Sequence, residues 1–112
     1  MKDLTNQSSL ADYQQFIKEI CEKRGWDKRT ALEKMLFLTE EVGEVAKALR
    51  KEHGIYGYPK PESTDHLAEE LVDVFNFLLD LANVYGIDMA DAFRQKWQKN
   101  VTRDWDGAYG QP

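Results

Sequence analysis

The stretch that decides the fold is TALEKMLFLTEEVGEVAKALRKE, residues 30–52. Apolar residues recur along it at helical spacing, which predicts one long amphipathic helix. Thr30 and Glu33 have the spacing of a capping box, in which each side chain accepts a hydrogen bond from the other residue's backbone N–H. We therefore expect a helix that opens at Thr30 and fades near Glu52. Its expected buried stripe consists of Leu32, Met35, Leu36, Val42, Val45, Ala46 and Leu49.

Three further helices are expected around this stretch. The first spans about residues 9–24 and ends at Gly25, because glycine readily takes the left-handed conformation that terminates a helix. The third starts near residue 64 and stops at Gly86, and the fourth is capped by Asp88 and runs to about residue 104. No stretch alternates with a period of two, so no strands of note are expected. The predicted fold class is all-α.

The length and charge of the chain restrict its class. With 112 residues it suits a single domain, residues 1–112. Its net charge of −5 argues against binding a nucleic-acid polymer, because there is no basic surplus to displace counterions. The one cysteine, Cys21, lies on an apolar helix face and is interpreted as a small core residue. No signal peptide, lipidation motif or membrane-length apolar run is visible, so we expect a cytoplasmic protein and no membrane partner.

Acidic residues form two short motifs in the second and third helices. The motifs are Glu40-Glu41-Val42-Gly43-Glu44 and Glu70-Leu71-Val72-Asp73. In each motif two acids lie on the same side of the apolar stripe. Measured around the helix axis from the middle of the stripe, Glu41 and Glu70 lie at about 100°, and Glu44 and Asp73 lie at about 160°. If the two helices pack as an antiparallel hairpin, both acidic edges line one groove. Four carboxylates around one point repel each other, and a hard cation such as Mg²⁺, which prefers oxygen ligands, relieves that repulsion.

Two other interpretations of these acids stay open at this point. Acids on the flank of an amphipathic helix are most often solvated, and Lys34, Lys47 and Lys51 have spacings that permit ordinary ion pairs with them. A di-iron bundle needs Glu-x-x-His motifs, and neither acidic motif contains a histidine. An all-oxygen site for Mg²⁺, with Mn²⁺ as a substitute, is therefore preferred over iron.

Basic, amide and aromatic residues supply a candidate substrate site. Lys96, Asn100 and Arg103 share one face of the fourth helix and suit phosphate oxygens, although cations near a helix C-terminus also simply favour the helix dipole. Trp26 and Phe77 have rings that can stack on a base or pack in the core. The amide of Asn76 can read a base edge or face solvent.

These motifs resemble the MazG-like nucleotide pyrophosphohydrolases of the all-α NTP pyrophosphatase superfamily, whose pattern is E-E-x-x-E followed by E-x-x-D. The resemblance covers roughly residues 10–105. It implies a four-helix bundle-like fold completed by oligomerisation, as a homodimer or homotetramer. It also implies that Glu41, Glu44, Glu70 and Asp73 hold Mg²⁺ and that Glu40 orients or deprotonates the attacking water. The basic strip is similar to the family's phosphate-binding segment, and Arg24-Gly25-Trp26 is similar to the segment that brings a Trp to the base in the dCTP-cleaving branch.

The activity implied by the resemblance is Mg²⁺-dependent cleavage of a (deoxy)nucleoside triphosphate to the monophosphate and pyrophosphate, as in housecleaning of the nucleotide pool. The preferred base is left open. The alternative is a non-catalytic helical interaction module that keeps the fold and presents its acids to a partner. Loss of one of the metal acids would mark such a module, and none is lost here.

Overall fold

A computed structural model describes residues 1–55 and 64–102 of the chain. All regular secondary structure in these residues is helical. Its elements are α1 (Leu10–Arg24), the short 3₁₀ helix η1 (Trp26–Lys28), α2 (Ala31–Glu52), α3 (Thr64–Val84) and α4 (Met89–Thr102). The all-α fold class is confirmed, and the described residues contain no strand. The short helix η1 was not predicted from the sequence. No helix in the described residues is long and apolar enough to cross a membrane.

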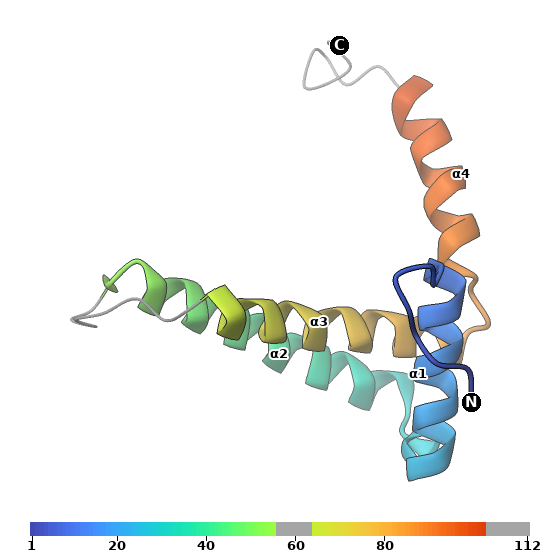
Figure 1. Cartoon of the computed structure of the whole chain (residues 1–112), viewed down its shortest axis with the longest axis horizontal. Coiled ribbons are helices and arrows are strands. Elements are labelled where there is room, and N and C mark those ends of the chain that lie inside the picture. Colours follow the sequence, from blue (N-terminus) through green and yellow to red (C-terminus); the bar gives the residue numbers. More distant parts are fainter. Residues whose placement is uncertain (56–63, 103–112) are drawn as a thin grey trace.

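The helices are arranged around an antiparallel hairpin of α2 and α3 (Figure 1). Helix α1 crosses this hairpin at the end where α2 begins and α3 finishes, and it packs mainly on α3. Helix α4 packs on α1 and turns away from the hairpin. The described helices of a single chain therefore do not close into a four-helix bundle, and completion of the bundle by oligomerisation stays a prediction.

Capping boxes begin the first two helices. In α2 the Thr30 hydroxyl accepts from the backbone N–H of Glu33, and the Glu33 carboxylate accepts from the backbone N–H of Thr30, as predicted. Ser9 and Asp12 do the same for α1. The hydrogen bond from the backbone of each cap residue lowers the pKa of Asp12 and of Glu33. Gly25 ends α1 with φ 74°, the left-handed geometry expected of it.

The buried side chain of Gln14 sets the direction of α4. Its amide Nε2 donates to Asn83 Oδ1 at 2.9 Å and to the Ile87 carbonyl at 2.6 Å. Its Oε1 accepts from the backbone N–H of Met89, the first residue of α4, at 3.0 Å. One amide thus ties α1 to the end of α3 and to the start of α4, which fixes the turn between them.

The core of the described chain is small. Its buried apolar residues are Cys21, Leu38, Ala48, Leu79 and Ala82. Lys34 on α2 is also buried, only 2% exposed, and its Nζ donates to Asp80 Oδ1 on α3 at 2.6 Å. This ion pair joins the two arms of the hairpin at the end where α1 crosses.

The predicted buried stripe of α2 is wrong for the single chain. Leu32 is 79% exposed, and Met35, Leu36, Val42 and Leu49 are exposed as well. The reason is that α2 turns a different face to α3, the face that carries Lys34, Leu38 and Ala48. Similar apolar side chains are exposed elsewhere: Leu71, Val72, Phe75 and Leu78 on α3, and Phe93, Trp97 and Val101 on α4.

Candidate functional site

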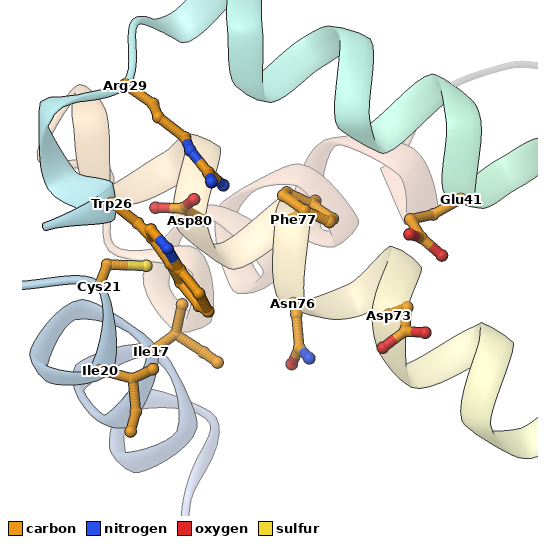
Figure 2. Close-up of a pocket in the computed structure, with 10 residues that line it drawn as sticks. All are labelled: Ile17, Ile20, Cys21, Trp26, Arg29, Glu41, Asp73, Asn76, Phe77 and Asp80. Atoms are coloured by element: carbon orange, nitrogen blue, oxygen red, sulfur yellow. The ribbon is translucent and has the colours of Figure 1, made fainter. Parts of the chain in front are cut away.

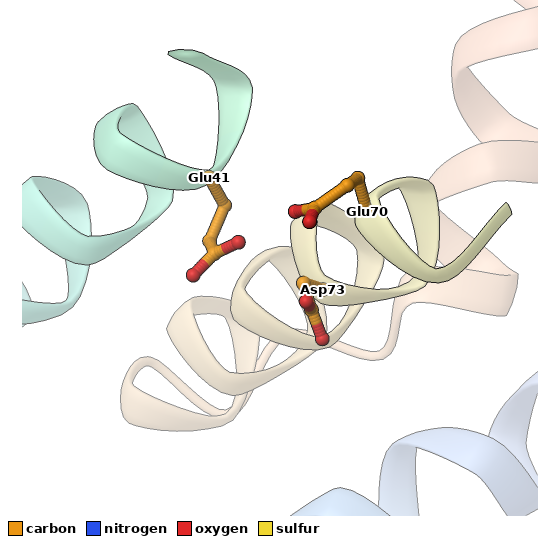
Figure 3. Close-up of side chains that lie close together, drawn as sticks. All are labelled: Glu41, Glu70 and Asp73. Atoms are coloured by element: carbon orange, nitrogen blue, oxygen red, sulfur yellow. The ribbon is translucent and has the colours of Figure 1, made fainter. Parts of the chain in front are cut away.

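Three carboxylates converge between the arms of the hairpin. Glu41 projects from α2 toward Glu70 and Asp73 of α3, and one oxygen of each lies within 4.8 Å of the others (Figure 3). Glu70 and Asp73 are neighbours on one helix face because they are three residues apart. The antiparallel packing of α2 and α3 brings Glu41 opposite them. The predicted meeting of the two acidic motifs is thus present for these three residues.

The three carboxylates have no Lys or Arg counter-charge within residues 1–55 and 64–102. Burial raises the pKa of Glu41, and the charges of Asp73, Glu70, Glu44 and Glu40 raise it further, in that order. No Lys or Arg in the described residues forms an ion pair with the three acids. In the described ranges, the imidazole of His66 contacts the cluster: its Nε2 lies 3.6 Å from Glu70 Oε1. The site therefore concentrates negative charge and favours an external cation.

The donor set fits a hard divalent cation. All three side chains offer carboxylate oxygens, and Mg²⁺ and Mn²⁺ prefer oxygen ligands. Glu44, the fourth predicted ligand, is exposed on α2 and is not part of the convergent group, although its charge acts on Glu41. Glu40, the predicted water-handling residue, is likewise exposed and close enough to influence Glu41 electrostatically.

A pocket of about 330 Å³ opens beside the carboxylates (Figure 2). Glu41 and Asp73 lie at one end of it, and Trp26 lies at the other end, where η1 and α1 meet the hairpin. Phe77 and Asn76 lie between the two ends. The three residues predicted to hold the base therefore line the same pocket as two of the predicted metal ligands.

Two of the three residues in the predicted phosphate-binding strip lie outside this pocket. Lys96 is exposed and Asn100 is buried on α4, and neither lines this pocket. Helix α4 points away from the hairpin in a single chain (Figure 1). The third member, Arg103, is outside the described residues. The single chain thus brings the acids and the base-pocket residues together but leaves Lys96 and Asn100 apart from them.

Two charged residues of the pocket were missed by the sequence analysis. Arg29 precedes the cap of α2, and Asp80 lies two helical turns after Asp73 on α3. The spacing of Asp73 and Asp80 is the signal that could have found Asp80, because residues seven apart share a helix face. The position of Arg29, next to a cap, carries no comparable signal.

The sequence of the chain is similar to those of known proteins. Residues 29–107 match the MazG nucleotide pyrophosphohydrolase domain. The uncharacterized protein YvdC of Bacillus subtilis strain 168 is 33% identical over 102 residues, which cover 84% of this chain and 94% of YvdC. The uncharacterized protein YpjD of the same strain is 31% identical over 106 residues, covering 95% of this chain and 92% of YpjD. The chain belongs to the MazG nucleotide pyrophosphohydrolase family.

Proposed function

We propose that this protein is a Mg²⁺-dependent nucleoside triphosphate pyrophosphohydrolase, which converts a (deoxy)nucleoside triphosphate and water to the monophosphate and pyrophosphate. The observation that carries the proposal is the convergence of Glu41, Glu70 and Asp73, without an internal Lys or Arg partner among the described residues, at one end of an aromatic-lined pocket. A triphosphate bound with its base toward Trp26 has its phosphates at the carboxylate end. Removal of non-standard or surplus nucleotides from the pool is the matching cellular role.

The residues that would hold the cation are Glu41, Glu70 and Asp73, with Glu44 completing the set after rotation of its exposed side chain. When bound, Mg²⁺ neutralises charge on the phosphates and polarises the phosphoryl group under attack. The carboxylates would fix the position of the cation, because they reach it from both α2 and α3. Mn²⁺ offers the same preference for oxygen and serves as a substitute.

Glu40 is the proposed base. It follows Thr39 on α2 and precedes the ligand Glu41, from which it lies about 100° around the helix, so it borders the site without belonging to the convergent group. In the reaction its carboxylate accepts a proton from water while the water oxygen bonds to the α-phosphorus. The bond from that phosphorus to the oxygen bridging to the β-phosphorus breaks, and pyrophosphate leaves.

Trp26, Asn76 and Phe77 would contact the base, and Lys96, Asn100 and Arg103 would contact the phosphates. Since α4 points away from the carboxylates of its own chain, we propose that it delivers this strip to the site of a second copy. The exposed apolar side chains of α2, α3 and α4 support a homo-oligomer, because monomeric proteins rarely leave such extensive apolar faces uncovered. Dimer and tetramer are both compatible with this proposal.

The test is a panel of the common NTPs and dNTPs incubated with the protein and Mg²⁺, with release of pyrophosphate and monophosphate as the readout. Cleavage of at least one nucleotide, lost on chelation with EDTA, is expected. Release of orthophosphate alone would contradict cleavage between the α and β phosphates. If no nucleotide is cleaved and Mg²⁺ does not raise the melting temperature, the non-catalytic interaction module becomes the better description, because a metal site stabilises the fold by RT ln(1 + [L]/Kd).

A further inference from the structure

Arg29 is a charged residue of the pocket to which the proposed reaction assigns no role. Its guanidinium projects into the end of the pocket remote from Glu41 and Asp73 (Figure 2). The guanidinium carbon lies 5.3 Å from the centre of the Trp26 ring and 4.8 Å from the centre of the Phe37 ring. Contacts of this kind hold an arginine by cation–π attraction and limit its rotamers.

The aromatic support of Arg29 is continuous with the pocket wall. Phe37 on α2 stacks on Phe77 of α3, with ring centres 5.7 Å apart and an angle of 23° between the planes. Phe77 itself lines the pocket. Arg29 is therefore built into the same wall as the residues proposed to contact the base.

The donors of this guanidinium are unused within the described part of the chain. Arg29 forms no ion pair or side-chain hydrogen bond there, and it is half-buried. The carboxylate of Asp80, which lines the same end of the pocket, is already engaged by Lys34 at 2.6 Å. A guanidinium carries five N–H donors and no acceptor, so this end of the pocket presents a fork of donors to whatever enters.

We infer that Arg29 is a specificity-determining residue, which donates two hydrogen bonds to a base that shows two adjacent acceptors. The inference rests on the proposed function, since the phosphates at the carboxylate end place the base at the Arg29 end. Guanine shows such a pair at N7 and O6, and cytosine shows one at N3 and O2. Adenine and thymine show no two adjacent acceptors: the N6 amino group lies between N7 and N1 of adenine, and N3–H lies between O4 and O2 of thymine. A fork that only donates therefore meets one acceptor and one donor there.

The experiment compares kcat/KM for dGTP, dCTP, dATP and dTTP in the wild-type protein and in Arg29→Lys. Wild type should favour dGTP, dCTP or both over dATP and dTTP by roughly ten- to a hundredfold, the usual value of a bidentate arginine–base contact. Arg29→Lys keeps the charge and loses the fork, so the preference should collapse while cleavage of dATP changes little.

Arg24→Lys is the matched control. The Arg24 guanidinium lies over the same Trp26 ring, at 5.0 Å, but Arg24 lines an adjoining cavity and not the pocket that contains Arg29. This variant should keep the wild-type order of bases. Melting temperatures of both variants verify that the fold is intact.

A binding measurement separates this inference from the proposed function. Calorimetry with the non-cleavable α,β-imido analogues of the same four nucleotides tests base preference without turnover. If wild type binds or cleaves all four bases alike, Arg29 does not select the base. If Arg29→Lys weakens all four equally, the residue holds phosphate or structure, and the inference is again overturned. Absence of cleavage together with a preserved, Arg29-dependent base preference in binding would overturn the proposed reaction alone.

Discussion

Asp73 and Asp80 are the same residue type, two turns apart on α3, and they line the same pocket. Asp80 accepts a hydrogen bond from buried Lys34 at 2.6 Å. Asp73 instead faces Glu41 and Glu70. One carboxylate is neutralised by the protein itself, and the other is placed among further negative charges.

The difference arises at equivalent positions of α2. Lys34 and Glu41 are two turns apart on α2, as Asp73 and Asp80 are on α3, and the helices run antiparallel. Asp73 and Asp80 therefore face the same side of α2. They differ in the residue opposite, which is Glu41 for Asp73 and Lys34 for Asp80. Lysine makes that position a structural ion pair, whereas glutamate adds a further negative charge and so makes it a candidate cation site.

The largest expected effect comes from placing a lysine opposite Asp73, as Lys34 is placed opposite Asp80. Glu41→Lys places a cation opposite Asp73, so the carboxylates gain an internal partner and lose their use as metal ligands. Turnover should fall by about a thousandfold or more, which corresponds to the several kcal/mol that a metal contributes to a phosphoryl-transfer transition state. Stability measured in EDTA should be unchanged or higher, because the repulsion around Glu41 is removed.

Glu69→Lys is the control for this charge reversal, since Glu69 is an exposed acid of α3 outside the cluster. It should retain turnover and the rise in melting temperature with Mg²⁺. Full activity in Glu41→Lys would remove Glu41 from the ligand set.

The second prediction concerns a variant that breaks the ion pair between Lys34 and Asp80. Asp80→Ala leaves the Lys34 ammonium buried without its partner, so the free energy of unfolding should fall by about 3–5 kcal/mol. Urea denaturation monitored by circular dichroism measures this change. Adding Lys34→Met should recover a large part of the loss, because the unpaired charge is then gone. A stable Asp80→Ala protein would show that Lys34 finds water or another acceptor instead.

The parts of this molecule that sequence reasoning predicted depend on local interactions. The side chains of Thr30 and Glu33 each accept a hydrogen bond from the other's backbone N–H within one helical turn. The start of α2 can therefore be predicted from these four residues of sequence alone. The meeting of Glu41 with Glu70 and Asp73 also followed from helical offsets, once an antiparallel hairpin was assumed.

The parts that it did not predict depend on how the helices are turned against each other. Helix α2 has apolar residues on more than one face, and periodicity did not reveal that the face with Lys34 and Leu38, rather than the face with Leu36 and Val42, meets α3. The burial of Lys34 was also not predicted, because a lysine is expected to be exposed to solvent unless a buried partner such as Asp80 is known. The direction of α4 depends on Gln14, through hydrogen bonds that span about seventy residues of sequence.

The smallest expected effect concerns Cys21, which lies beside the neutralised pair. Burial, followed by the charge of Asp80, raises the pKa of its thiol from 9.0 to about 11. At pH 8 the thiolate fraction of the folded protein is then about a hundredfold below that of the unfolded chain, so iodoacetamide should alkylate Cys21 slowly until urea is added. Below pH 9 the thiol is protonated in both states and affects stability little. Between about pH 9 and pH 11 only the unfolded chain releases the proton, so stability should fall as the pH rises through this window. Cys21→Ala should lack that component of the pH dependence, and rapid alkylation of the native protein at pH 8 would contradict a buried thiol beside the charged Asp80.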